Sequence, residues 1–257
     1  MLVSVPNISE GRDQAALQAI ATAFAPVYWS SDAHHNRAVF TLVGEPGKLH
    51  QQVLVGAREA IARLDLTHHA GVHPRVGVVD VAPIVYLSED DKGAACAEAL
   101  VLADELGQLG VPVYLYGELG GGRTRAELRR PGGLGTPDFG PPTHPTAGAT
   151  LVAARPPLVA FNVEIDAPLE TAKEIATILR GTLDVRALGL QAERVQVSTN
   201  IEDHTRVTAA DVVAAVRRHA EVTGAELVAP APRAALADFP EDVPLRGPAP
   251  LEDHLPS

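Results

Sequence analysis

Three histidines, an arginine and an aspartate gather in one short stretch of the chain, residues 68–83, which reads HHAGVHPRVGVVDVAP. Histidine has an unperturbed pKa near neutrality, so a histidine here could act as a general base or bind a metal. Pro74 restricts the preceding His73 to an extended backbone, which would aim its ring in one direction. Arg75 could bind a carboxylate, and Asp80 could orient a ring or stabilise a cation. This stretch is therefore the first candidate for a catalytic site.

A second polar cluster, residues 34–37, lies between two hydrophobic runs and reads HHNR. Asn36 could donate to and accept from a ligand, although an Asn just before a strand is more often a turn residue. The histidines of both clusters could together bind zinc for a hydrolase; they are His34, His35, His69 and His73. The sequence contains neither an H-E-x-x-H motif nor a cysteine pair, so this metal site is the weaker hypothesis.

A third cluster follows the first hydrophobic run, at residues 5–12, which read VPNISEGR. Asn7 and its neighbours precede a predicted helix, and backbone N–H groups at a helix start could bind an anion. A capped helix start without a ligand explains the same residues. The glycine-rich stretch 117–124 lacks the lysine of a phosphate-binding loop, and no G-x-S-x-G motif is present.

The composition describes a folded protein with an aliphatic core. The chain has 257 residues, of which 46% are hydrophobic and only 4% aromatic. A formal net charge of −11 argues against a general binder of nucleic acid or of anionic membranes, which would need a basic face. The single cysteine, Cys96, excludes an internal disulfide. With no apolar run of 18 residues and no signal-peptide pattern, the expected location is the cytoplasm.

The elements that must position these clusters follow from hydrophobic periodicity, which predicts the order β-α-β-β-α-β twice. The first set comprises strands at 2–6, 27–30 and 37–44, helices at 16–24 and 46–63, and a strand behind the histidine segment. A helix at 90–108 and a strand at 111–117 extend it before a Gly- and Pro-rich passage. The second set comprises strands at 158–165, 184–191, 194–202 and 226–230, with helices at 168–181 and 208–222.

This order predicts an N-terminal subdomain at residues 1–157 and a C-terminal subdomain at 158–232. Residues 233–257 contain too much proline and too little apolar surface to fold alone, so we expect a partly mobile Pro-rich tail.

Seven segments of the chain resemble, in order, the formiminotransferase domain. They are VPNISEGR at 5–12, HNRAVFTLVG at 35–44, GVHPRVGVVDVAP at 71–83, VPVYLYGE at 111–118, PDFGP at 137–141, LVAFNV at 158–163 and QVSTNIED at 196–203. The segment around His-Pro-Arg is the most specific. The resemblance implies an α/β protein of two consecutive ferredoxin-like subdomains with mixed sheets, a ligand tunnel between them, and a homodimer. It also implies the stand-alone form, without the cyclodeaminase that some members carry.

The activity implied by the resemblance is transfer of the formimino group of N-formimino-L-glutamate to N5 of tetrahydrofolate, in histidine degradation and one-carbon metabolism. Tetrahydrofolate would be the co-substrate, and no metal is needed. The catalytic histidine of the family falls on His73. The candidate substrate-binding residues are Asn7, Asn36, Arg37, Arg75 and Asp80. The folate loop falls on Gly140, Pro141, Pro142, Thr143, His144, Pro145, Thr146, Ala147 and Gly148.

The chain departs from the family pattern at two positions. Ser30 stands where the family often has an acidic residue on the strand before the second cluster, and Asp32 follows two positions later. Ala147 stands where a tryptophan can occur. Three alternatives stay open at this point: a metal-dependent hydrolase, a non-catalytic module that binds folate or carboxylates, and transfer of a formyl group in place of formimino.

Overall fold

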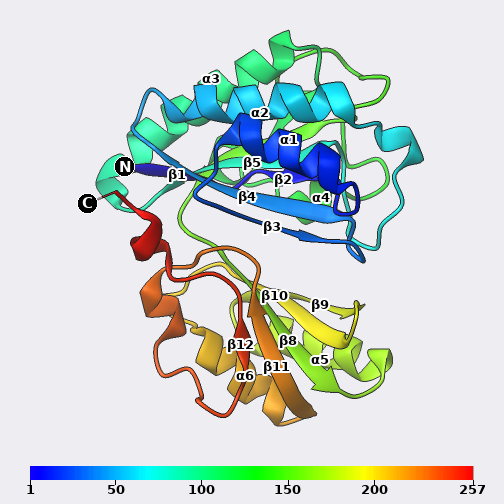
Figure 1. The fold of residues 1–257 in the computed structure, drawn as a ribbon, viewed down its shortest axis with the longest axis vertical. Coiled ribbons are helices and arrows are strands. Elements are labelled where there is room, and N and C mark those ends of the chain that lie inside the picture. The colour runs from blue at the N-terminus through cyan, green and yellow to red at the C-terminus, as the bar shows by residue number, and fades with distance from the viewer. Residues whose placement is uncertain (257) are drawn as a thin grey trace. The chain divides into compact units, whose positions relative to one another are not determined.

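The computed structural model describes residues 1–256, and its internal contacts divide the chain into two units, Met1–Pro156 and Pro157–Ser257. Each unit has its own sheet and its own hydrophobic core, as Figure 1 shows by the two groups of strands.

The first unit is built on one mixed sheet whose central strands follow the ferredoxin-like order. Its strands are β1 (Leu2–Ser4), β2 (Asn7–Ile8), β3 (Tyr28–Asp32), β4 (Arg37–Gly44), β5 (Val79–Tyr86), β6 (Val113–Leu115) and β7 (Thr150–Arg155). The short β1 and β2 succeed each other between β4 and β5 and pair antiparallel with both. Strand β3 lies beyond β4, so the order across the sheet is β3, β4, the pair β1 and β2, then β5. If β1 and β2 count as the first strand, this is the ferredoxin-like order 2-3-1-4. Strands β7 and β6 extend the sheet beyond β5, each parallel to its neighbour.

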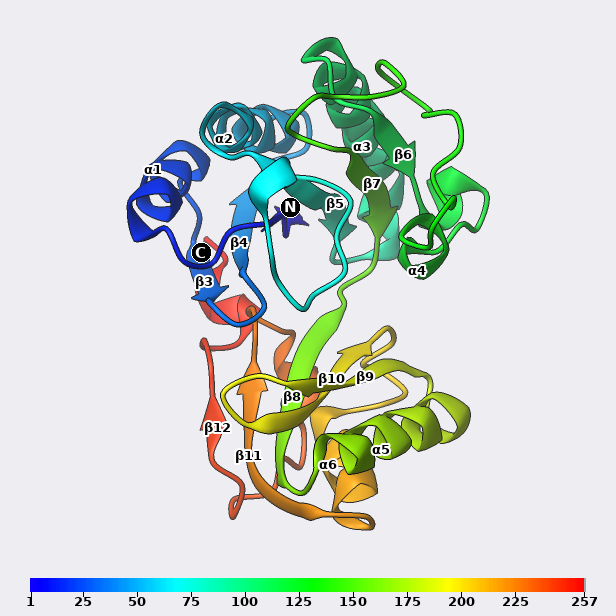
Figure 2. The ribbon, with the colours of Figure 1, turned by 90° about the vertical axis from the view of Figure 1, so that its right-hand side faces the viewer.

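Three helices cover one face of this sheet: α1 (Gln14–Phe24), α2 (Leu49–Arg63) and α3 (Lys92–Gln108) (Figure 2). Asp13 caps the start of helix α1, and its side chain accepts hydrogen bonds from two backbone N–H groups of the first turn. Its apolar positions recur at helical spacing and bury Leu17, Ile20 and Phe24. Gly56 of α2 lets the helices approach closely, since a Cβ there would overlap the Phe24 ring. The short α4 (Arg125–Leu128) lies in the Gly-rich passage.

The second unit repeats the order. Strands β8 (Val159–Asp166), β9 (Val185–Gln191), β10 (Val195–Ile201) and β11 (Glu221–Leu227) form an antiparallel sheet in the order β11-β8-β10-β9. Helices α5 (Leu169–Thr182) and α6 (Ala209–Arg217) pack on it around a core that includes Phe161 and Leu179. The structure thus confirms the predicted class, two consecutive ferredoxin-like units with mixed sheets.

Several elements differ from the prediction. Strand β7 was not predicted, because its alanine-rich sequence TLVAAR lacks the alternation and β-branched density of a typical strand. Helix α6 ends at Arg217 and β11 begins at Glu221, earlier than expected. A shift of register between Val222 and Gly224 interrupts the alternation of side chains along β11, so the start of this strand was predicted as part of the preceding helix.

The Pro-rich segment after residue 232 belongs to the second unit and is not a loose tail. Its strand β12 (Leu245–Arg246) pairs in parallel with β11. Val243 belongs to the core of this unit, and Leu251 is also buried, although the surrounding sequence is polar. Prolines favour the extended backbone that such a peripheral strand requires.

Candidate active site

The strand β5 provides the rigid base of the candidate site. All eight of its residues are buried, including Asp80, whose side chain is fully shielded from solvent. Asn7 pairs with Val81 while Ile8 pairs with Val79, so Asp80 is an extra residue in β5, at a β-bulge. A bulge breaks the pairing locally and re-aims a side chain, which explains how an aspartate enters a strand otherwise made of apolar residues.

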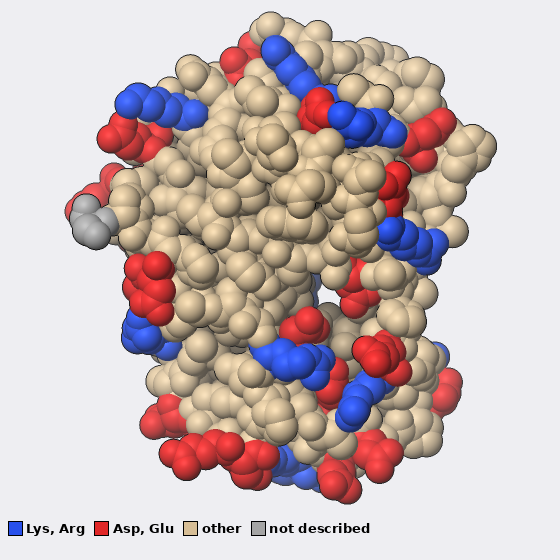
Figure 3. All heavy atoms as spheres, viewed as in Figure 1, with Lys and Arg blue, Asp and Glu red and all other residues tan. Residues whose placement is uncertain are grey.

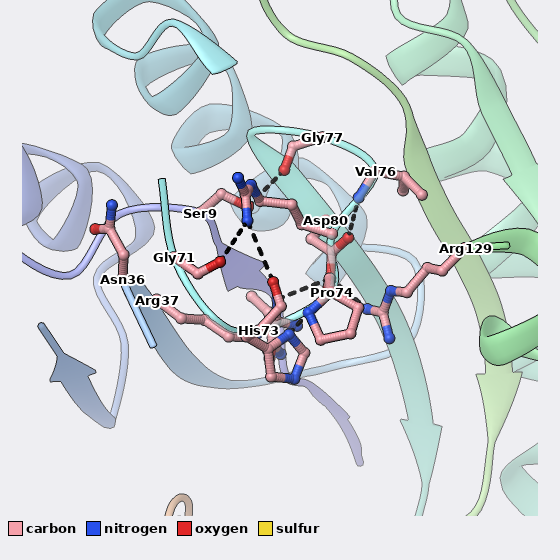
Figure 4. Close-up of polar contacts among 12 residues, drawn as sticks. Ser9, Asn36, Arg37, Gly71, His73, Pro74, Val76, Gly77, Asp80 and Arg129 are labelled. Carbon is pink, nitrogen blue, oxygen red and sulfur yellow. Dashed lines mark hydrogen bonds and ion pairs between the residues drawn. The ribbon is translucent and has the colours of Figure 1, made fainter. Parts of the chain in front are cut away.

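Two arginines bind the Asp80 carboxylate. Arg37, the first residue of β4, donates from Nη1 to Asp80 Oδ2 at 2.8 Å, and Arg129 donates from Nη2 to the same oxygen. The other oxygen, Oδ1, accepts the backbone N–H of Val76 at 2.7 Å. Burial would raise the pKa of Asp80, but the two guanidinium groups and this N–H lower it below its usual value. One buried carboxylate therefore lies between two cations, as Figure 4 shows.

Arg129 is a site residue that the sequence analysis missed. It follows α4, which begins with a capping box between Thr124 and Glu127. The signal was present in the stretch RTRAELRR, where Arg125 and Arg129 are four residues apart and so share a helix face. The side chain of Arg129 is 13% exposed, and its Nε is buried with no hydrogen-bond partner among the described residues. Unpartnered donors of this kind suit an anionic ligand.

His73 lies half-buried beside this cluster. Its Nδ1 is 2.7 Å from the carbonyl oxygen of Pro74. A carbonyl only accepts, so Nδ1 carries the proton and Nε2 presents a lone pair. Burial, together with the positive charges of Arg37 and Arg129, lowers the pKa of His73 to about 3, against a smaller opposing effect of Asp80. His73 is therefore neutral at pH 7 and able to accept a proton.

The structure brings all three polar clusters of the sequence together. Asn36 is the main link: its Oδ1 accepts the backbone N–H of Gly11 at 2.8 Å, and its Nδ2 donates to the carbonyl of Ala70 at 3.0 Å. Asn36 adopts a positive φ of 48°, the left-handed conformation that asparagine tolerates in a turn. Asn7 accepts from Nε of Arg37 at 2.9 Å. Both asparagines thus support the site through backbone and arginine contacts.

Arg75 folds its own loop. Its guanidinium donates to the carbonyl oxygens of Gly71, His69 and His73, at 3.1, 2.7 and 3.3 Å. Those bonds close the segment around His73 and leave Arg75 committed to three carbonyls, unlike Arg37 and Arg129. His69 donates in turn to the carbonyl of Asn36, 3.0 Å away, while the side chain of His68 is exposed.

The segment 140–148 runs beside the histidine loop. The backbone of Val78 donates to the carbonyl of Ala147 at 2.8 Å, and Gly77 and Gly148 form an isolated bridge. Gly77 has no room for a side chain, because a Cβ would lie 1.9 Å from the carbonyl oxygen of Ala149. Nδ1 of His144 accepts the N–H groups of residues 146 and 147, which shapes the turn. Pro142, Thr143 and Pro145 are exposed, while Gly140 and Gly148 take positive φ.

Residues 1–256 contain no group of three or more His, Cys, Asp or Glu side chains placed to hold a metal ion. The histidines proposed for zinc have other contacts: His35 with Asp32, His69 with a backbone carbonyl, and His73 with Pro74. No helix within these residues has the length and apolar character needed to cross a bilayer. On the face drawn in Figure 3, basic side chains lie scattered among acidic ones.

Residues 1–155 match the protein family described as the formiminotransferase domain, N-terminal subdomain. The chain belongs to the formiminotransferase family. It is 37% identical over 201 residues to the glutamate formimidoyltransferase of Streptococcus pyogenes. The match covers 69% of this chain and 67% of that protein. The glutamate formimidoyltransferase of Thermoplasma acidophilum is 33% identical over 236 residues, 79% of this chain and 77% of its own length.

Another member of the family, the formimidoyltransferase-cyclodeaminase of Sus scrofa, is 36% identical over 236 residues. This match covers 77% of the present chain but 43% of the pig protein. Both kinds of relative have formimidoyltransferase in their names. These matches agree with the resemblance inferred from the His-Pro-Arg segment.

Proposed function

We propose that this protein is a glutamate formimidoyltransferase, an enzyme that moves the formimino group of N-formimino-L-glutamate to N5 of tetrahydrofolate. The observation that carries the proposal is a neutral His73 beside the buried cluster Arg37–Asp80–Arg129, in the part of the chain that matches the family. A base next to a cationic cluster suits an anionic amidine donor. A metal-dependent hydrolase is not favoured, since His35, His69 and His73 have other contacts and the relatives are named as formimidoyltransferases.

The cationic cluster is the proposed site for the carboxylates of the donor. Arg37 and Arg129 carry two positive charges against one negative charge on Asp80, which leaves a net charge of one in a largely buried place. Guanidinium groups bind carboxylates through paired hydrogen bonds, and burial strengthens that attraction. Asp80 aligns both arginines, while Asn7, Asn36 and Arg75 stabilise the surrounding loops. Among the candidate substrate-binding residues, Arg37 is the one we place against the donor.

His73 is the proposed general acid and base. As N5 of the acceptor forms a bond to the formimino carbon, His73 takes the N5 proton on Nε2. The imidazolium then gives a proton to the glutamate nitrogen as the bond from that nitrogen to the formimino carbon breaks, so no proton is gained or lost overall. Acid-base assistance of this kind is worth on the order of 10²- to 10⁴-fold in rate.

Binding of the donor also suits the acid-base role. In the free protein, burial and the two arginine charges hold the pKa of His73 near 3, which is too low for a strong base at pH 7. A donor carboxylate on Arg37 and Arg129 offsets those charges, so the proton affinity of His73 rises when the substrate is present. By linkage, binding of the anion and protonation of His73 favour each other.

Tetrahydrofolate is the proposed co-substrate, and the segment from Gly140 to Gly148 is proposed to contact it. Supporting this assignment, the backbone of the segment is fixed next to the histidine loop while several of its residues remain exposed. We also propose, from the family, a homodimer, a cytoplasmic location and a role in histidine degradation. Sedimentation equilibrium tests the dimer, which a single monomeric species would contradict.

A transfer assay with purified protein tests the function. With tetrahydrofolate and N-formimino-L-glutamate, the wild type should release glutamate and form the 5-formimino product, and His73→Ala should be about 10²- to 10⁴-fold slower. An equally active His73→Ala would remove the proposed role of the histidine. N-formyl-L-glutamate in a parallel reaction distinguishes the two donors. Tight folate binding without turnover on either donor would instead indicate a binding module, and loss of activity with EDTA would indicate a metal enzyme.

A further inference from the structure

A second histidine lies against the proposed catalytic one. The ring centroids of His35 and His73 are 6.4 Å apart, and the rings are inclined at 66°, an edge-to-face arrangement. His35 belongs to the tight turn between β3 and β4, and its side chain is 11% exposed. Gly71 permits the approach of the two loops, because a Cβ there would lie 2.6 Å from the carbonyl oxygen of His35.

Asp32 fixes the His35 ring. Its Oδ1 accepts the backbone N–H groups of His34 and His35, at 2.7 and 2.8 Å, and lies 3.1 Å from Nδ1 of His35. Burial would raise the pKa of Asp32, but the hydrogen bonds and charge of His35, with the N–H of His34, lower it to about 2. The carboxylate is therefore ionised and can only accept, so Nδ1 of His35 carries the proton.

Strand β3 and the turn after it place this pair beside His73. Ser30 and Asp32 are two residues apart on β3, so their side chains point to the same face of the strand. Asp32 is next on that face, and the turn that follows brings His35 between this carboxylate and His73.

We propose that Asp32 and His35 form a carboxylate–imidazole pair that positions His73 and supports its protonated state. The inference rests on the proposed function. The other charged groups that face His73 are Arg37 from β4, Arg129 after α4, and Asp80 from β5. A proton on His73 would place a third positive charge beside those of Arg37 and Arg129, with only the negative charge of Asp80 to balance them. The Asp32 carboxylate adds a second negative charge on the turn side, through the polarised His35 ring.

Three variants separate this role from simple packing. His35→Phe keeps a ring against His73 but removes the contact with Asp32, and Asp32→Asn keeps an oxygen that accepts the two turn N–H groups but removes the charge. His34→Ala is the matched control, because it lies in the same turn with an exposed side chain. Circular dichroism and thermal unfolding establish that each variant is folded.

The measurements are kcat and KM for N-formimino-L-glutamate and the pH profile of kcat. We expect kcat to fall about ten- to a hundredfold in His35→Phe and Asp32→Asn, with KM changed less than threefold, since the donor contacts Arg37 and Arg129. The acid limb of the Asp32→Asn profile should move to lower pH. Wild-type kcat in both variants, or an equal loss in His34→Ala, would overturn the pair.

A measurement without turnover keeps the pair testable apart from the reaction. In protein labelled with ¹⁵N-histidine, His73 should show a single tautomer protonated at Nδ1 at pH 7, as its contact with Pro74 requires, and His35→Ala should change the nitrogen shifts of His73 because the edge-to-face contact is lost. Unaltered shifts in His35→Ala would overturn the positioning role. An inactive wild type that passes this test would contradict the proposed function while leaving the pairing of the two rings intact.

Discussion

At the scale of single residues, the site depends on one buried carboxylate. Asp80 has no exposed side-chain surface, and both of its oxygens accept hydrogen bonds. The desolvation of a buried ion is costly, so each ion is tolerated only because its partners offset that cost. Arg37 and Arg129 depend on Asp80 in the same way. This mutual dependence keeps two guanidinium groups rigid and ready for an anionic ligand.

Replacement of Asp80 by asparagine tests that dependence. Asp80→Asn retains the size of the side chain but leaves Arg37 and Arg129 partly buried without an anionic partner. We expect the free energy of unfolding at pH 7 to fall by about 3–5 kcal/mol, measured by urea denaturation. Glu59→Gln, which removes the partially exposed ion pair with Arg63 on α2, should cost less than about 1 kcal/mol. Equal effects of the two changes would contradict the argument.

The pKa of His73 makes a prediction about acid stability. In the unfolded chain this histidine gains a proton near pH 6.5, whereas in the folded protein it stays neutral down to about pH 3. The unfolded state therefore binds more protons between these values, and stability falls as the pH falls. His73→Asn removes this contribution, so its stability relative to the wild type should improve by at most about 2 kcal/mol between pH 7 and pH 5.

Urea denaturation of both proteins at several pH values gives that difference directly. The exposed His68 provides the control, and His68→Asn should follow the wild-type curve over the same range. A constant difference between wild type and His73→Asn from pH 7 to pH 5 would show that His73 titrates alike in the folded and unfolded chain.

At the scale of elements, the sequence predicted what depends on local pattern. Helix α1 and the strand β5 follow from hydrophobic periodicity. The local chemistry of the His-Pro-Arg segment made it the first candidate for a catalytic site, and the resemblance to the family singled out His73. The sequence could not show how distant residues pair. The bulge at Asp80 depends on pairing with β2, and the contact of Arg129 with Asp80 spans 49 residues. Strand β7 was missed because tertiary burial, not propensity, makes its alanine-rich run a strand.

The close packing between the histidine loop and the segment before β7 gives a prediction at this scale. Gly77→Ala would place a Cβ 1.9 Å from the carbonyl oxygen of Ala149 and 2.9 Å from that of Ala147. Both obstacles are backbone, so the loops must separate, and we expect a loss of about 2–4 kcal/mol in unfolding free energy together with reduced transfer activity. Gly93→Ala in α3 meets nothing within 4 Å and should stabilise the protein by about 0.5–1 kcal/mol. A stable, fully active Gly77→Ala would contradict this view of the site.

At the scale of the whole molecule, the same topology occurs twice but has developed differently in the two units. The first unit extends its sheet with β7 and β6 on the side of β5 and carries the polar clusters of the candidate site. The second unit adds only the short β12 beside β11, from the Pro-rich end of the chain. Each unit has a separate core of buried residues, so each element stabilises the unit in which it lies.

The C-terminal strand β12 allows this independence to be tested. Arg246 donates from Nη2 to Oε1 of Glu164 at 2.5 Å, and the Glu164 side chain is only 8% exposed. Arg246→Met removes the principal partner of a buried carboxylate, which should cost the second unit about 1–3 kcal/mol. Amide hydrogen exchange should then accelerate in β8 and β11 and remain unchanged in β5 and β7. Arg186→Met, which breaks an exposed pair with Glu202, should leave exchange unaltered throughout. Acceleration of β5 to the same extent as β8 would show that the two cores unfold as one, and that the proline-rich end of the chain stabilises the candidate active site as well as its own unit.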